Sequence, residues 1–326
     1  AADGGGVFAL GGAPTLERLK VKGHQNGQRG GGMYLESTSA RLEAIELLDN
    51  RVSGQGGGLF LSYGTGVNLE GLRIDGNQSS GNGGGMYLYR SDTHIVDLEV
   101  EDNVSASTSG GGMYCDLGSL TLEVARFDNN SVAGGSESQG GGGLFLSNLD
   151  DAVLDQLEVT GNRSNGNGGG LSIVNSEGVL LEDSLVDANT AVTFGGGLSM
   201  YDSSRGSVRL ERTTFTSNHA RWGGGVWGGR MNLASLQSLF MENTCDEFGA
   251  GIYLSITDVE IYNNLFLANT ANRQGGALYL DNASGEVVNN TLAVNYAGER
   301  ASGIQVVTGT PTLLNNILGY GEGSSV

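Results

Sequence analysis

The sequence has little proline, little lysine and few cysteines, and it has no long apolar run. Two prolines in 326 residues exclude a collagen-like chain or a proline-rich linker, even though glycine is abundant. No stretch approaches the roughly 18 consecutive apolar residues of a membrane helix, and no signal-peptide pattern stands at the N-terminus. Two cysteines, Cys115 and Cys245, are too few for a disulfide framework. The chain begins with Ala1-Ala2-Asp3 and has no initial methionine, which fits the product of signal-peptide cleavage. We therefore expect an exported and already processed chain.

Positive charge is also scarce. Seventeen Lys and Arg residues face 36 Asp and Glu residues, which gives a net charge of −19, and Lys20 and Lys22 are the two lysines. Such a surface repels phosphate backbones and anionic lipids. Nucleic-acid partners and membrane insertion are therefore not expected.

What the chain has in excess is glycine, 58 residues, and most of it is periodic. A glycine-rich triplet followed by an apolar residue recurs along the whole chain, at spacings of 26 to 31 residues. The triplets end at Gly6, Gly32, Gly58, Gly85, Gly112, Gly143, Gly170, Gly197, Gly225, Gly251, Ala277 and Gly303. The longest spacing contains the segment Ser131–Gly143. This period is typical of a repeat protein.

An asparagine column runs in phase with the glycines. It consists of Asn50, Asn77, Asn103, Asn130, Asn162, Asn189, Asn218, Asn243, Asn269 and Asn295. An apolar residue stands three positions before each of them, so the repeat contains (apolar)-x-x-Asn. We expect the stacked amides to form hydrogen bonds between coils, and the asparagine itself to accept the left-handed backbone of a tight corner.

Apolar residues alternate with a period of two after each triplet, as in Met33/Leu35 and Leu59/Leu61, which is strand patterning. A unit of this length cannot bury its apolar face alone and must stack on its neighbours. The sequence therefore predicts an all-β, right-handed parallel β-helix of about 12 coils of 26–31 residues, forming one domain over residues 1–326.

Two motifs together resemble a known family. Gly-Gly-Ala-Leu at 275–278 and Phe-x-x-Asn at Phe127–Asn130, Phe215–Asn218, Phe240–Asn243 and Phe266–Asn269 resemble the repeats of polymorphic outer membrane proteins. The resemblance covers nearly the whole chain, and it implies a secreted right-handed β-helix with a role such as adhesion. Two departures are that no membrane barrel follows here, and that Leu, Val or Ile replaces the phenylalanine in several repeats.

No catalytic residue can be assigned from the sequence. Other β-helices cleave acidic polysaccharides, so a lyase or glycosidase is the alternative function, but two lysines in one segment do not suit a lyase. Asp75, Glu101 and Asp128 stand two positions before ladder asparagines and are weak candidates for calcium ligands. A solvated acidic edge is the simpler interpretation. No cofactor and no transition-metal site are predicted.

Histidines and cysteines have structural interpretations. His24 occupies the asparagine position of the first coil, and His219 follows Asn218. Cys115 falls at an inward strand position, which predicts a buried thiol. Cys245 lies about five coils away, roughly 24 Å, so the two cysteines cannot form a disulfide.

Aromatic residues mark the outward strand position between the two inward apolar residues. The aromatic members of this column are Phe8, Tyr34, Phe60, Tyr87, Tyr114, Phe145, Trp227, Tyr253 and Tyr279, with Ser172 and Ser199 forming a gap. We expect an exposed stripe that binds a glycan or a protein partner. The alternative is that the rings stack on one another and cover the neighbouring glycines.

A secondary patch is predicted where the repeat departs from its own pattern. Phe194, Trp222 and Phe248 replace the polar residues found three positions before other triplet ends, and Arg221 and Arg230 lie nearby. Gly228 stands where an inward apolar residue is expected. Departures from a repeat often carry function. The alternative is plain packing, in which the glycine accommodates a neighbouring tryptophan, and we favour this interpretation.

The sequence thus favours a structural or adhesive module at a bacterial cell surface or in an extracellular fibre over an enzyme. Ala1–Asp3 and Gly321–Val326 leave no room for a capping helix at either end. Exposed end coils are normally capped. We therefore expect either a segment of a longer chain or a subunit that associates end to end.

Overall fold

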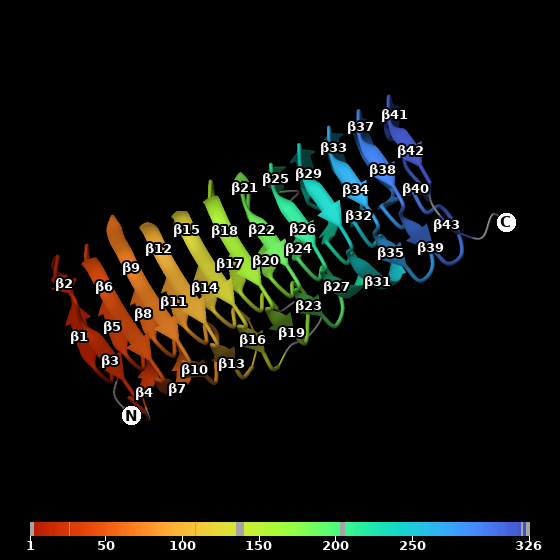
Figure 1. Cartoon of the computed structure of the whole chain (residues 1–326). Helices are drawn as coiled ribbons and strands as arrows, with labels where there is room; N and C mark the ends of the chain where they lie inside the picture. Colours follow the sequence, from red (N-terminus) through yellow and green to blue (C-terminus); the bar gives the residue numbers. More distant parts are fainter. Residues whose placement is uncertain are drawn as a thin grey trace.

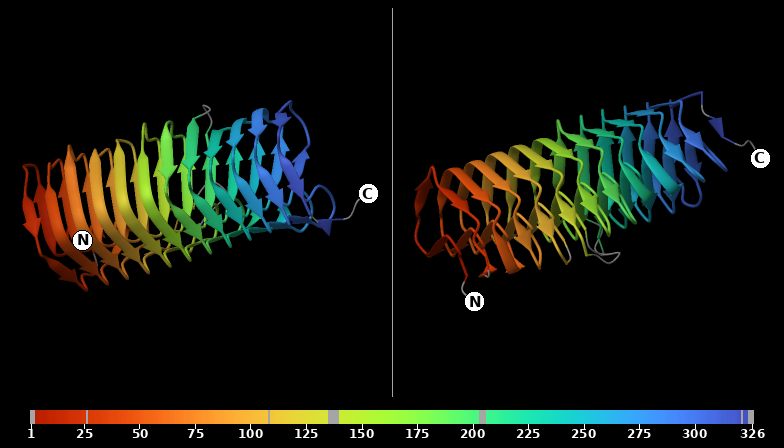
Figure 2. Two further views of the ribbon diagram at one scale, coloured as in Figure 1. Left: turned by 45° about the horizontal axis from the view of Figure 1, so that its top comes forward. Right: turned by 60° about the horizontal axis from the view of Figure 1, so that its bottom comes forward.

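The computed structural model describes residues 3–25, 27–107, 109–134, 140–202, 206–320 and 322–323. Every regular element in these residues is a β-strand, and the coils stack into one elongated solenoid with the two termini at opposite ends (Figures 1 and 2). The predicted parallel β-helix of about 12 coils is confirmed. Part of the longest coil, residues 135–139, and the terminal residues 1–2 and 324–326 lie outside the described residues.

Three sheets run the length of the solenoid, and each coil contributes to all three. Sheet A contains, in the described residues, β1 (Val7–Leu10), β5 (Met33–Glu36), β8 (Leu59–Ser62), β11 (Met86–Tyr89), β14 (Met113–Asp116), β17 (Leu144–Ser147), β20 (Leu171–Val174), β24 (Leu198–Tyr201), β28 (Val226–Gly229), β32 (Ile252–Ser255), β36 (Leu278–Asp281) and β40 (Ile304–Val306). Sheet C contains β4 (Gly27–Arg29), β7 (Arg51–Gln55), β10 (Gln78–Ser79), β13 (Val104–Ser105), β16 (Ser131–Val132), β19 (Arg163–Ser164), β23 (Thr190–Ala191), β27 (His219–Trp222), β31 (Thr244–Phe248), β35 (Thr270–Ala271), β39 (Tyr296–Ala297) and β43 (Glu322–Gly323).

Sheet B lies between sheets A and C along the chain and is bent in the middle, so that it has a first and a second limb. Its long strands are β6 (Arg41–Leu48), β9 (Val67–Asp75), β12 (Thr93–Glu101), β15 (Leu120–Asp128) and β18 (Val153–Thr160). In the other coils the first limb is β2 (Thr15–Glu17), β21 (Val179–Glu182), β25 (Ser207–Glu211), β29 (Asn232–Leu236), β33 (Asp258–Tyr262), β37 (Ser284–Val288) and β41 (Thr312–Leu314). Their second limb is β3 (Lys20–Lys22), β22 (Leu185–Asp187), β26 (Thr214–Thr216), β30 (Leu239–Met241), β34 (Leu265–Leu267), β38 (Thr291–Ala293) and β42 (Ile317–Gly319).

The register of the strands follows the repeat. Met33 pairs with Leu59, Tyr34 with Phe60 and Leu35 with Leu61, all in parallel strands. Like residues therefore stack in columns, and the inward apolar columns form one continuous core in which Met33, Leu35 and their equivalents are fully buried. Side-chain period and coil length together fix this register, because a slip of one residue would turn the apolar columns outward.

Left-handed residues make the corners of each coil. In the second coil they are Ser37 (φ 54°), Ala44 (φ 53°), Asp49 (φ 53°) and Gly56 (φ 65°). Three of these four corners use residues with a side chain, which points outward. The fourth corner requires glycine, because a Cβ on Gly56 would lie 2.3 Å from the Leu59 carbonyl oxygen and 3.1 Å from the Phe60 Cα.

The predicted asparagine ladder is confirmed. Each ladder asparagine is buried, and from Asn50 to Asn269 its Nδ2 donates to the Oδ1 of the asparagine in the next coil at 2.9–3.0 Å. The backbone N–H donates to the same Oδ1, as Asn130 N–H does to Asn162. His24 joins the ladder through its backbone, since its N–H donates to Asn50 Oδ1 at 3.0 Å.

The ladder also explains the spacing in (apolar)-x-x-Asn. The second Nδ2 hydrogen of Asn162 goes to the carbonyl oxygen of Phe127, which stands three residues before Asn130 in the preceding coil. The apolar residue of the motif thus buries its side chain in the core and offers its carbonyl to the next asparagine. One expectation is wrong: the left-handed conformation belongs to the residue before the asparagine, as in Asp49 and Asn129, both with φ 53°.

A second asparagine ladder, which was not predicted from the sequence, lies at the bend of sheet B. Asn264 Nδ2 donates to Asn290 Oδ1 at 3.1 Å, and Asn290 Nδ2 to Asn316 Oδ1 at 3.0 Å. Ser238 leads into it through its N–H, which donates to Asn264 Oδ1 at 2.8 Å. The signal was present, because these asparagines are 26 residues apart and Ile261, Val287 and Leu313 stand three positions before them.

Both ends of the solenoid expose apolar side chains. At the first coil, Phe8 is 57% and Leu10 65% exposed. At the last coil, Leu314, Ile317 and Leu318 are 53%, 63% and 65% exposed. The interior equivalents of Phe8 and Leu318 are covered, since Tyr34 is 3% and Leu292 is 1% exposed. None of the described residues forms a helix long and apolar enough to cross a membrane.

Candidate binding surface

The outward aromatics of the first six coils form a regular stack, the N-terminal ring stack, made of Phe8, Tyr34, Phe60, Tyr87, Tyr114 and Phe145. Successive ring centroids are 5.0–5.2 Å apart and the ring planes are within 6° of parallel. Tyr34, Phe60 and Tyr87 form a cluster separate from the main core. The predicted strand parity is therefore correct.

The expectation that this stripe is exposed is wrong for most of its rings. Tyr34 and Phe60 are each 3% exposed, and Tyr87, Phe145 and Tyr279 are also buried. Neighbouring rings cover both faces of each ring, and the left-handed glycine corner folds the preceding segment against the outer side of sheet A. The Arg29 guanidinium adds cover, lying 5.2 Å from the Phe60 ring centroid.

Burial changes the acidity of the phenols in this stack. Loss of hydration raises the pKa of Tyr34 to about 12, assisted by the hydrogen bond of its hydroxyl group to Glu36 at 2.6 Å. Loss of hydration also raises the pKa of Tyr87 to about 12, with the nearby Asp116 carboxylate as the next cause. The N-terminal ring stack therefore acts as a second, outer core and not as an open platform.

The gap at Ser172 and Ser199 divides the column, and beyond it the aromatic residues are arranged differently. Six rings, which we call the C-terminal aromatic cluster, gather there: Phe194, Trp222, Trp227, Phe248, Tyr253 and Tyr279. Phe194 stacks on Trp227 with centroids 4.4 Å apart, although Ser199 is the strand partner of Trp227. Phe194 thus takes the place of the ring that the outward column lacks at Ser199.

The cluster joins the predicted stripe to the predicted secondary patch. Phe248 lies against Tyr279 with centroids 5.0 Å apart, and Phe194 against Trp222 at 5.0 Å. Trp222, Trp227, Phe248 and Tyr253 all remain partly exposed, unlike the middle of the N-terminal ring stack. The structure therefore brings Phe194, Trp222 and Phe248 together with the last rings of the outward column.

Two guanidinium groups lie on this cluster. The Cζ of Arg221 is 4.1 Å from the Trp222 centroid, and the Cζ of Arg273 is 4.9 Å from the Phe248 centroid. Glu247 bridges the two arginines, at 2.7 Å from Arg221 and 3.7 Å from Arg273. Glu299 holds Arg273 at 2.8 Å and raises the pKa of its guanidinium. Arginine and carboxylate charges therefore balance within the cluster.

Local irregularities in the backbone make room for the large rings. The pairing of β27 with β31 shifts register between Ala220 and Trp222. A Cβ on Gly229 would lie 2.7 Å from the Trp227 ring, so Gly229 lets the indole lie along the strand. A Cβ on Gly228 would meet Met200 at 2.5 Å and Leu254 at 2.7 Å, because these side chains fill the inward space. Gly228 is therefore needed for packing against Met200 and Leu254, whereas the glycine that accommodates the tryptophan is Gly229 and not Gly228.

Arg230 does not belong to the cluster. It follows β28 at the end opposite to Trp222, has a left-handed backbone with φ 57° and is exposed. Arg273, which was not predicted from the sequence, lies on the cluster instead. Arg273 is 25 residues after Phe248, about one coil length, and this spacing was the only sequence signal for it.

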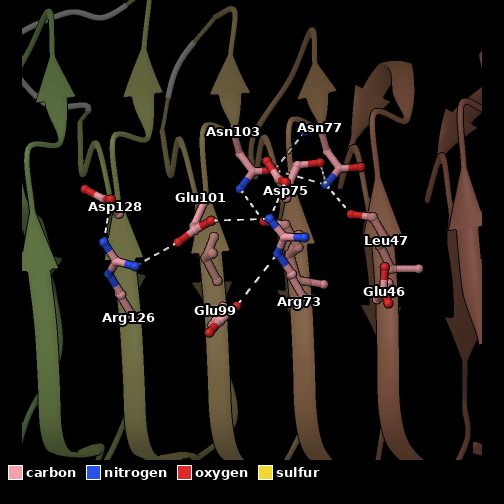
Figure 3. Close-up of polar contacts among 12 residues, drawn as sticks. Glu46, Leu47, Arg73, Asp75, Asn77, Glu99, Glu101, Asn103, Arg126 and Asp128 are labelled. Atoms are coloured by element: carbon pink, nitrogen blue, oxygen red, sulfur yellow. Dashed lines mark hydrogen bonds and ion pairs between the residues drawn. The ribbon is translucent and has the colours of Figure 1, made fainter. Parts of the chain in front are cut away.

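The three candidate calcium ligands do line up in adjacent coils, but arginines lie between them (Figure 3). Arg73 Nη2 is 2.9 Å from Asp75 and 3.6 Å from Glu101, and Arg126 pairs with Glu101 at 3.0 Å and Asp128 at 2.8 Å. A guanidinium between each pair of carboxylates occupies the space that an ion would need. In the described part of the chain, no group of three or more His, Cys, Asp and Glu side chains could hold a metal.

Both cysteines are buried free thiols, as predicted for Cys115. Burial raises the pKa of Cys115 to about 12 and also raises that of Cys245. Neither thiol is therefore suited to act as a nucleophile near neutral pH. The histidines serve local contacts, His94 with Glu123 at 3.2 Å and His219 with Thr244 at 2.9 Å.

A shallow hollow of about 690 Å³ lies on the outer face of the first limb of sheet B, between β21 and β37. Arg209, Glu260 and Glu286 line it, with Ala234 as the small residue between the longer side chains. The Tyr262 hydroxyl donates to Glu286 at 2.7 Å, which raises the pKa of the phenol to about 12. No candidate residue from the sequence lies in this hollow.

Comparison with known proteins identifies the fold family. A family model described as a right-handed β-helix region matches residues 2–153 and 155–318. No curated protein sequence matches the chain. Among solved structures, a double mutant of the periplasmic alginate epimerase AlgG is similar, with a TM-score of 0.36 and 10% identity over 91% of this chain and 77% of that chain. Because the family model matches nearly the whole length of the chain, this protein belongs to the right-handed β-helix family.

Proposed function

We propose that the chain is a structural and adhesive β-helix module that binds a neutral glycan through the C-terminal aromatic cluster. The observation that carries this proposal is the partial exposure of Trp222, Trp227, Phe248 and Tyr253 in one cluster of stacked rings. Aromatic side chains of this kind combine an apolar surface with little conformational entropy to lose on binding.

The chemistry around the rings supports a neutral ligand. Arg221 and Arg273 are already paired with Glu247 and Glu299, so the cluster presents paired donors and acceptors without excess charge. Hydroxyl groups of a sugar can use both kinds of partner. The net charge of −19 on the whole chain disfavours acidic polysaccharides by long-range repulsion.

Native protein on a glycan array, followed by calorimetric titration, tests this function. Trp222→Ala and Phe248→Ala should each weaken glycan binding at least tenfold. Phe8→Ala is the matched control, because it removes a ring that is 57% exposed at the far end of the solenoid. Binding that survives both cluster variants, or the absence of any glycan bound by the native protein, would contradict the proposal.

The same preparation distinguishes the two other functions considered. Turnover of a polysaccharide would favour the enzyme alternative predicted from the sequence. Capture of a protein ligand that depends on Trp222 would favour a protein partner over a glycan.

We further propose that the module is exported and acts at a cell surface or in an extracellular fibre. The resemblance of its repeats to polymorphic outer membrane proteins supports this location. Cell fractionation tests this location.

A further inference from the structure

The outer face of the second limb of sheet B changes character along the solenoid. From β6 to β18 its outward side chains are almost all charged: Glu46, Arg73, Asp75, Glu99, Glu101, Arg126, Asp128 and Glu158. Figure 3 shows the ion pairs that Arg73 and Arg126 form in this half. Charges of both signs are held there by their neighbours and by water.

From β26 to β42 the same outward positions carry no charge. They are Thr214, Thr216, Leu239, Met241, Leu265, Leu267, Thr291, Ala293, Ile317 and Gly319. Leu236, Tyr262 and Val288 stand beside them at the end of the first limb. We call this outer side of β26, β30, β34, β38 and β42 the uncharged face.

The core does not require apolar residues on this face. Phe240, Phe266 and Leu292, the inward residues of β30, β34 and β38, are buried and fill the interior. The uncharged face points the other way, and Leu265 is 37% exposed on it. The N-terminal half of the same limb shows that charged residues are accepted at these positions. A row of leucines and a methionine there therefore indicates a contact surface.

We propose that the uncharged face binds a second copy of this chain in a side-by-side dimer. Two chains that each carry a net charge of −19 repel each other, so they approach most easily where both surfaces are uncharged. The uncharged face meets this condition in both copies. It spans about five coils, roughly 24 Å, and two such sheet faces pack about 10 Å apart.

Charge fixes the orientation of the two copies. If the solenoids ran parallel, the charged halves would face each other, each with six carboxylates and two guanidinium groups. In an antiparallel pair, a two-fold axis along β34 places each uncharged face on the other and leaves both charged halves in water. This arrangement is isologous, with the same patch used by both copies.

The side chains match in size under this symmetry. Leu265 and Leu267 lie on the axis and meet their own counterparts. One coil to either side, Met241 faces Ala293 of the partner subunit, and Leu239 faces Thr291 of the partner subunit. On either side of the axis a large side chain is thus opposite a small one, which allows the two faces to approach closely there.

Charge-swap variants test the dimer and its axis together. The mass of the native chain is measured by sedimentation across a wide concentration range, with circular dichroism as the check on folding. We expect a monomer–dimer equilibrium that shifts towards dimer at higher salt, because salt screens the repulsion between the chains. Leu265→Lys and Leu265→Glu should each weaken the dimer at least tenfold, because like charges would meet at the axis.

An equimolar mixture of the Leu265→Lys and Leu265→Glu variants should restore the dimer as a heterodimer. Val124→Lys, at a 49% exposed position of sheet B in the charged half, is the matched control and should leave the equilibrium unchanged. If Leu265→Lys fails to fold, Ala293→Lys at the edge of the uncharged face replaces it. A chain that stays monomeric at high concentration, a dimer insensitive to these variants, or a mixture that does not re-form dimers would overturn the proposal.

Discussion

Asn162 sits in the middle of the asparagine ladder, and its replacement by alanine removes four hydrogen bonds at once. Its Oδ1 accepts from the backbone N–H and the Nδ2 of Asn130, at 2.9 and 3.0 Å. Its Nδ2 donates to Phe127 O at 2.9 Å and to Asn189 Oδ1 at 3.0 Å. The bond from its own N–H to Asn189 Oδ1 survives the substitution.

The cost follows from the groups left without a partner. The Asn130 N–H, one Nδ2 hydrogen of Asn130 and one acceptor site on Phe127 O all stay buried. Each such group costs about 1 to 3 kcal/mol, reduced where the structure relaxes or a water enters the space. We expect Asn162→Ala to lower the free energy of unfolding by about 2 to 4 kcal/mol.

The change in melting temperature can be derived from the chain length. An unfolding entropy of about 2.1 cal/mol/K per residue over 326 residues gives about 0.7 kcal/mol/K, so 1 kcal/mol shifts Tm by about 1.5 °C. Calorimetry should therefore show a fall of about 3 to 6 °C for Asn162→Ala. Asn272→Ala is the control, because Asn272 is exposed and directly follows β35, and it should change Tm by less than 1 °C.

Asn162→Asp sharpens the test. An aspartate keeps the acceptor for Asn130 but cannot donate to Phe127 O, and it places a charge in a buried site. It should therefore destabilise the fold more than alanine does at neutral pH. An unchanged Tm for Asn162→Ala, or a milder effect for Asn162→Asp, would refute the ladder as a source of stability.

The remaining predictions concern the glycine corner, the buried thiols and the ion-pair row. Gly56→Ala should lower the free energy of unfolding by about 2 to 4 kcal/mol, because it adds a clash to a left-handed backbone. Gly66 also has a left-handed backbone, with φ 60°, but there is open space around its Cβ, so Gly66→Ala should cost about 1 kcal/mol in the same thermal assay. The raised pKa of about 12 for Cys115 contributes stability in full below pH 9.0, where the thiol is neutral in both states. This contribution is lost as the pH rises from 9.0 towards 12, so urea midpoints should fall there, and native protein at pH 8 should not react with a thiol reagent until it is unfolded. Arg126→Ala should change the free energy of unfolding by less than about 1 kcal/mol, because the ion pairs of Arg126 are exposed. Calcium should not raise the Tm of the native chain. A large rise in Tm with calcium would contradict the arrangement in Figure 3, in which arginines lie between the carboxylates.

Some features of the candidate binding surface could be predicted from the sequence and others could not. Stacking along the outward column follows from register, since Tyr34 and Phe60 occupy the same place in successive coils. The burial of these rings does not follow from register, because it depends on how closely the glycine corner and Arg29 approach them. The cluster around Trp227 was also beyond sequence reasoning, since Phe194 reaches it from a different column.

By itself the sequence determined the features that are local or that repeat with the coil. Periodic glycines, alternating apolar residues and (apolar)-x-x-Asn motifs specify the coil length, the strand parity, the core columns and the asparagine ladder, because a stacked repeat places equal positions in contact. Only the tertiary structure decided which outward side chains are exposed, where arginines separate the carboxylates of Asp75, Glu101 and Asp128, and where the uncharged face lies. These features depend on the angles at the corners and on contacts between different columns, which no single column of the repeat encodes.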